Sequence, residues 1–244
     1  MKPLQLLALG TALALLAAPS PGGFTQVVGS GETNHKAIWT HIFGAPAVGA
    51  NWGGATYTGG NYTAWRVNDT PYTQGTELPF CCHFTEAGLA PFTDQWWVDG
   101  VGTARAKAVF AGHSHSFGIR PSPNANPTWL FNVAGQQSFL NAPFSGPFNT
   151  GALFEWMHRD TNTGLVVSSV EAKNTDTKDH MLTYYVKGFA YPTWVLFWED
   201  LASPGWDQDY NDLVVMVQCI PAPAAAMLGV IGLGLVGWVK RRLS

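Results

Sequence analysis

The sequence predicts an all-β fold, a single jelly-roll-like β-sandwich, and three observations indicate it. Gly, Thr, Asn, Trp and Phe are abundant in the central part of the chain, whereas Lys, Glu and Leu are sparse. Short stretches of this part alternate between apolar and polar residues with a period of two. Turn-forming residues separate these stretches at short intervals, as in sandwiches and barrels. The central segment, residues 29–219, has the length of one domain.

The first expected element is one short N-terminal helix within residues 29–43. Polar residues Glu32 and Thr33 stand near its start, and the apolar residues at 38, 39, 42 and 43 fall on one face. Residues 44–61 are rich in glycine and show little periodicity, so we expect an exposed loop there.

About nine short strands should follow. Their expected ranges are 62–67, 96–98, 105–112, 129–133, 152–158, 165–171, 181–187, 194–198 and 213–218. Residues 121–127 and 141–151 read as turn-rich connections.

The strongest internal motif is an acidic segment between the last two expected strands. Five carboxylates and one asparagine fall within residues 199–212, where like charges would repel one another unless a cation neutralised them. Asp207, Asp209 and Asn211 have the i, i+2, i+4 spacing that begins many calcium loops, although Asp212 and Gln218 depart from the full EF-hand pattern. We therefore predict a Ca²⁺ site, with these candidate ligands: Glu199, Asp200, Asp207, Asp209, Asn211 and Asp212. The alternative is that the carboxylates cap backbone N–H groups in a complex turn.

Both ends of the chain carry export signals. Lys2 precedes an apolar stretch from Leu4 to Ala18, and residues 19–23 break it, so residues 1–23 are expected to be a secretory signal peptide. At the other end, a Pro-Ala-Pro stretch precedes an apolar run at 224–239 and a basic cluster, a pattern that places the basic end in the cytoplasm. The signal residues of this tail are Pro221, Pro223, Lys240, Arg241 and Arg242.

The segment 220–244 resembles the PEP-CTERM sorting signal of bacterial surface proteins, with Ala222 where that signal has Glu. The resemblance implies an exosortase-type membrane protease as partner and delivery to the cell surface or outside the cell. It also implies transient or retained anchoring in the inner membrane through 224–239. An ordinary C-terminal tail anchor is the alternative.

A second resemblance covers most of residues 29–219. The block from Trp198 to Val215, with its Glu-Asp-Leu and Asp-Gln-Asp-Tyr-Asn-Asp-Leu-Val-Val runs, resembles the end of the bacterial family called domain of unknown function 4114. The blocks 108–118 and 179–184 also resemble segments of such proteins. The resemblance implies a secreted β-rich domain without an established enzymatic activity.

The net charge limits the classes of partner, and the cysteine content predicts a disulfide bond. Residues 29–219 carry nine Lys or Arg and sixteen Asp or Glu, a net charge of −7, which disfavours nucleic acid and suits cations. Of three cysteines, Cys219 is expected to pair with Cys81 or Cys82 in an oxidising compartment, unless all three stay reduced and buried.

Tryptophans in or near loops suggest a carbohydrate-binding alternative, in which indole rings stack on extracellular polysaccharide. The candidates are Trp52, Trp96, Trp97, Trp129 and Trp206, and the competing interpretation is core packing.

His113 and His115 have the spacing for one shared transition metal, but a polar strand edge is the favoured interpretation.

Catalysis is weakly indicated. The chain contains no Gly-x-Ser-x-Gly motif, and nothing pairs the carboxylates that a glycosidase would need, so a hydrolase is the least favoured alternative. The sequence thus predicts a non-catalytic exported protein, held together in part by Ca²⁺.

Overall fold

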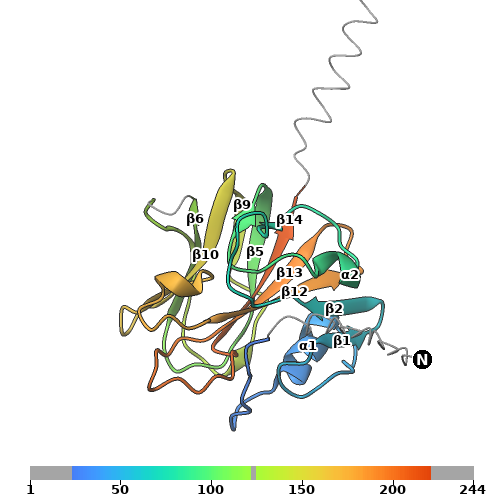
Figure 1. Ribbon diagram of the computed structural model, residues 1–244. Helices are drawn as coiled ribbons and strands as arrows, with labels where there is room; N and C mark the ends of the chain where they lie inside the picture. The colour runs from blue at the N-terminus through green and yellow to red at the C-terminus, as the bar shows by residue number, and fades with distance from the viewer. Residues whose placement is uncertain (1–23, 122–124, 221–244) are drawn as a thin grey trace, which may run out of the picture.

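The computed structural model describes residues 24–121 and 125–220, and it confirms the predicted all-β sandwich (Figure 1). The predicted signal peptide and the sorting segment from Pro221 onward lie outside the described residues. In the part of the chain that is described, none of the helices has the length and apolar character needed to cross a bilayer.

The larger sheet runs in the order β1-β2-β12-β13-β14-β5-β8, with β9 also paired to β5. Its strands are β1 (Thr56–Gly59), β2 (Tyr62–Arg66), β12 (Met181–Lys187), β13 (Thr193–Trp198), β14 (Leu213–Cys219), β5 (Val101–Val109), β8 (Ser138–Phe139) and β9 (Phe144–Asn149).

The smaller sheet runs β3-β4-β10-β6-β7, with β11 also paired to β10. Its strands are β3 (Leu78–Pro79), β4 (Trp97–Val98), β10 (Leu153–Asp160), β6 (His115–Pro121), β7 (Thr128–Val133) and β11 (Val166–Ser168). The helical elements are α1 (His35–Phe43), α2 (Glu86–Leu89) and a 3₁₀ turn, η1 (Glu171–Lys173).

Strand β13 shows how the sequence builds the two layers. Alternate residues of a strand point to opposite faces. Trp194, Leu196 and Trp198 enter the core between the two sheets. Val195 and Phe197 enter a second apolar cluster on the outer face of the larger sheet. Both faces of this strand are therefore buried, which explains its continuous apolar sequence.

Helix α1 covers that outer face, where it lies beside β1 (Figure 1). Asn34 caps its start by accepting a hydrogen bond from the Ala37 amide, and Gly44 ends it with a left-handed φ of 64°. All four apolar residues expected on one face of the helix, including Trp39, are buried. The expected short N-terminal helix is thus confirmed, and it begins at His35.

Two expected loops contain strands. The prediction of an exposed loop over 44–61 was wrong for β1, where Tyr57 is fully buried and stacks on Trp39. The turn-rich stretch 141–151 contains β9, which pairs with the long strand β5. In both places backbone pairing with an adjacent strand outweighs glycine and proline content that locally favours turns.

Candidate metal centre

The acidic segment, residues 199–212, connects β13 to β14, and we call it the acidic loop. The two strands form an antiparallel pair in which Trp198 lies opposite Leu213. Both of these side chains are fully buried, so the sandwich core fixes the two ends of the acidic loop.

The N-terminal part of the domain packs against the acidic loop and shapes it. His35 Nε2 lies 2.6 Å from the carbonyl oxygen of Asp209, and the Asn211 amide nitrogen donates to the Thr33 carbonyl at 3.1 Å. Two non-glycine residues, Gln208 and Tyr210, take left-handed φ values of 63° and 55°. Strained conformations of this kind persist where surrounding contacts enforce them and are frequent at functional sites.

Three oxygens of the acidic loop are buried without a hydrogen-bond partner among the described residues. They are Glu199 Oε2, Asp209 Oδ2 and Asn211 Oδ1, and each of the three residues is at most 1% exposed. Their other polar atoms are engaged: Glu199 Oε1 accepts from the Leu201 amide, and Asp209 Oδ1 accepts from the Asn211 amide. A buried oxygen left unpaired costs about 1–3 kcal/mol, so three such oxygens in one loop make it a candidate ligand site.

Two of these residues, Glu199 and Asp209, belong to a compact group of possible metal ligands. Glu199, Asp209 and the exposed Asp207 each offer a carboxylate oxygen within 4.8 Å of the others. A second group of the same compactness contains Glu199, Asp200 and Asp212. The structure therefore brings all five predicted carboxylate ligands into two groups that share Glu199.

Hydrogen bonds also support the turn-capping alternative at one position. Asp212 Oδ2 accepts from the Asp200 amide at 2.7 Å, so this carboxylate caps the backbone of the acidic loop. Capping accounts for this oxygen but leaves the three unpaired oxygens unexplained.

Burial and mutual repulsion make these acids hard to ionise without a cation. Burial, and then the charge of Asp207, raise the pKa of Glu199 to about 9. Burial raises the pKa of Asp200 and of Asp209 to about 6, and it raises the pKa of Asp212 well above its usual range. A divalent cation would reverse these shifts because it stabilises the ionised carboxylates.

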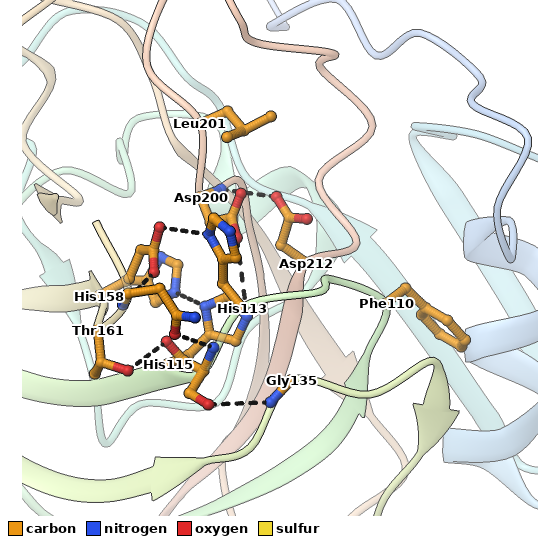
Figure 2. A network of polar contacts seen from close by, with 12 residues as sticks. Phe110, His113, His115, Gly135, His158, Thr161, Asp200, Leu201 and Asp212 are labelled. Atoms are coloured by element: carbon orange, nitrogen blue, oxygen red, sulfur yellow. Dashed lines mark hydrogen bonds and ion pairs between the residues drawn. The ribbon is translucent and has the colours of Figure 1, made fainter. Parts of the chain in front are cut away.

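A histidine cluster lies next to Asp200 (Figure 2). His158 Nε2 lies 2.9 Å from His115 Nδ1, and His115 Nε2 lies 3.9 Å from Asp200 Oδ2. His113 Nδ1 lies 2.8 Å from Asp160 Oδ2. Burial lowers the pKa of His115 to about 4 and that of His158 well below its usual range, so both rings are neutral at pH 7.

The histidine cluster corrects the interpretation as a polar strand edge. His113 precedes β6 in a bend, whereas His115 is fully buried on β6, which pairs with β10 on one side and with β7 on the other. His158 is one of the histidines that could have supplied a third ligand, but sequence reasoning did not single out Asp160, which carries no motif of its own. The antiparallel pairing of β6 with β10 sets Asp160 opposite His115, a register that the sequence does not reveal.

A pocket of about 230 Å³ opens beside both clusters. Its lining includes His113, Asp200, Asp207, Asp212 and Glu32. The pocket gives an ion a route from solvent to these groups.

The tryptophan prediction was wrong at two positions. Trp97 is fully buried and donates to the Asp94 carbonyl, and Trp96 is 8% exposed, because both rings pack within the fold. Trp52, Trp129 and Trp206 are partly exposed.

Cys81 and Cys219 form a disulfide bond, and Cys82 is free and exposed.

Comparisons with known proteins do not identify a family. No protein-family model matches the chain, and no curated protein matches it. Among solved structures, the chain is similar to the C-terminal domain of the BC2L-C lectin from Burkholderia cenocepacia, with 15% identity and a TM-score of 0.36. The match covers 53% of this chain and 97% of the lectin domain. A similarity of this size carries no conclusion about the function of this chain.

Proposed function

We propose that this protein is an exported, non-catalytic bacterial surface or extracellular-matrix protein whose β-sandwich binds Ca²⁺ in the acidic loop. The observation that carries the calcium site is the set of three buried, unpaired oxygens on Glu199, Asp209 and Asn211. Carboxylate and amide oxygens are the ligands that Ca²⁺ prefers, and six to eight of them complete its coordination.

The proposal of export rests on the two ends of the chain. Residues 1–23 have the composition of a signal peptide, and residues 220–244 resemble a sorting signal that an exosortase-type protease recognises. The disulfide between Cys81 and Cys219 supports an oxidising location, because such bonds persist mainly outside the cytosol. Mass measurement of the protein recovered from its native cell surface would test both processing sites.

The calcium site would stabilise the domain by mass action. A ligand present at about 1,000 times its Kd stabilises the folded state by roughly 4 kcal/mol. For a domain of this size, each kcal/mol raises the Tm by about 2–4 °C. We therefore expect Ca²⁺ to raise the Tm of the purified mature protein by roughly 10 °C relative to the same protein in EGTA.

Two matched variants make this test specific. Asp209→Asn should abolish the calcium response while keeping the shape of the side chain, whereas Asp99→Asn removes one charge from an exposed turn and should keep the full response. Equal Tm values for the wild-type protein in Ca²⁺ and in EGTA would refute the calcium site.

Carbohydrate binding is a second candidate, supported by one exposed arrangement. Trp129 lies on β7, at the edge of the smaller sheet, and the Arg159 guanidinium sits 4.7 Å from the centre of its ring. A partly exposed indole held by a cation offers a face for a sugar ring. A glycan array probed with the wild-type protein and with Trp129→Ala would test it: binding that the variant loses supports this function, and no binding by the wild type refutes it.

A further inference from the structure

A third group of ligand atoms lies beside the calcium site and has a different chemistry. His113, Asp160 and Asp200 each offer one ligand atom, and the three atoms lie within 4.8 Å of one another. This group includes an imidazole, whereas the group around Asp209 offers only oxygens.

His115 supplies the observation that points to a ligand. Its Nε2 atom is fully buried and has no hydrogen-bond partner among residues 24–121 and 125–220. The atom lies 3.9 Å from Asp200 Oδ2, too far for a hydrogen bond. Two ligands of a tetrahedral zinc ion, with bonds of about 2.0–2.2 Å, are roughly 3.3 Å apart. A shift of about half an ångström would let both atoms bind one ion.

We propose that His113, His115, Asp160 and Asp200 form a binding site for a divalent transition metal such as Zn²⁺. Two imidazoles and two carboxylates suit a borderline-soft ion with four-coordinate geometry. The same ligands suit Ca²⁺ poorly, because Ca²⁺ takes six to eight oxygens. The two sites therefore bind different classes of cation, although Asp200 also belongs to the carboxylate group of the acidic loop.

Neighbouring groups hold these ligands in position. His158 Nε2 lies 2.9 Å from His115 Nδ1 and can accept a hydrogen bond from the Nδ1–H group, which leaves the Nε2 lone pair of His115 free for a metal. Asp160 Oδ1 accepts hydrogen bonds from the amides of Asn162 and Thr163, at 2.8 and 3.3 Å. Ligands of metal sites are commonly oriented by such outer hydrogen bonds.

The site is also reachable from solvent. The His113 side chain is 39% exposed, and both His113 and Asp200 line the 230 Å³ pocket. A metal ion can therefore exchange with solvent without unfolding of the sandwich, and a water molecule can enter with it.

The test is a zinc titration of the folded mature protein after chelator treatment. Because Cys82 is free and exposed beside His83, all samples carry Cys82→Ser to remove an adventitious thiolate. Calorimetry should show one Zn²⁺ per chain, and Co²⁺ should give the intense visible absorption of a four-coordinate site. His113→Gln should weaken Zn²⁺ binding by at least about 10-fold. His83→Gln, which changes an exposed histidine elsewhere, should leave it unchanged.

Two further variants separate this site from the calcium site. Asp209→Asn should keep Zn²⁺ binding and lose the calcium response, while His113→Gln should do the reverse. His115→Gln should also lose Zn²⁺ binding. If this buried variant does not fold, His113→Gln still decides the test, because His113 is partly exposed. The proposal is overturned if Zn²⁺ does not bind in the Cys82→Ser background, or if His113→Gln binds it as tightly as His83→Gln does.

Discussion

The substitution Glu199→Gln distinguishes two properties of the acidic loop, the protonation of its buried acid and its binding of Ca²⁺. Burial and the nearby Asp207 charge raise the pKa of Glu199 to about 9, so the metal-free protein holds this side chain protonated at pH 7. Glutamine has nearly the shape of a protonated glutamic acid. Keeping Glu199 protonated at pH 7, above its ordinary pKa, costs the wild-type protein roughly 3 kcal/mol, and glutamine does not carry that cost. We therefore expect the metal-free variant to be more stable than the metal-free wild-type protein at pH 7 by roughly that amount, and to lose most of its calcium affinity.

The expected pH dependence of calcium affinity follows from the raised pKa of Glu199. Ionising Glu199 at pH 7 costs about two pKa units, or roughly 3 kcal/mol, and a bound Ca²⁺ must offset that cost. If one proton leaves as Ca²⁺ binds, the calcium affinity of the wild-type protein should rise by about 10-fold per pH unit between pH 7 and pH 9. The variant should lack the part of this dependence that Glu199 contributes.

Raising the pH strengthens calcium binding, but it should lower the free energy of unfolding of the metal-free protein. A carboxyl group whose pKa is raised by folding binds its proton more tightly in the folded state. Its contribution to the free energy of unfolding is therefore complete below its pKa in the unfolded chain. That contribution disappears as the pH rises through its pKa in the folded protein. Between pH 7 and pH 9, Glu199 should thus cost the metal-free wild-type protein roughly 2 kcal/mol of unfolding free energy. Subtracting the profile of Glu199→Gln removes the contributions of the other buried acids.

Urea denaturation at pH 7, 8 and 9, in EGTA and in saturating Ca²⁺, measures both effects. Glu86→Gln is the matched control, because Glu86 is exposed at the start of α2. The reasoning is refuted if Glu199→Gln keeps the wild-type calcium affinity, or if its metal-free stability falls with pH as steeply as that of the wild type.

Three other substitutions test the scaffold. Cys81→Ser should cost about 2–5 kcal/mol, because the disulfide closes a loop across 138 positions, and chemical denaturation with and without reductant measures it. Arg66→Met should cost roughly 3–5 kcal/mol in urea denaturation, because it removes the positively charged partner that lies 2.6 Å from the buried carboxylate of Asp69. Gly118→Ala should lower the Tm by several degrees, since a Cβ there would lie 2.3 Å from a backbone oxygen of β7, whereas Gly146→Ala, with open space around it, should have little effect.

The sequence predicted the elements whose patterns are local. The apolar run of β13 and the helical spacing of α1 come from burial on defined faces, and both are visible in the residues themselves. The acidic loop was visible for the same reason, because its carboxylates are close along the chain. Strand β1 was missed because its pairing with β2, and not its own composition, makes it a strand.

The histidine cluster could not be predicted in the same way. His113 and Asp160 are separated by 47 positions and meet because β6 and β10 pair with a defined register. The support of the acidic loop is equally non-local, since Thr33 and His35 reach Asn211 and Asp209 from the other end of the domain. Short-range patterns do not encode such convergence, and only the fold supplies it.

The position of the acidic loop in the sandwich determines what its ions can do. Trp198 and Leu213, at the two ends of the loop, are fully buried in a core that extends between both sheets. That core does not depend on the loop carboxylates, so the metal-free protein should remain folded, with Glu199 protonated at pH 7. Loops of this kind open locally at lower free energy than the strands that carry them. Calcium would therefore act on the local order of residues 199–212. Because the N-terminal segment contacts the same loop through Thr33 and His35, that order would extend to the start of α1.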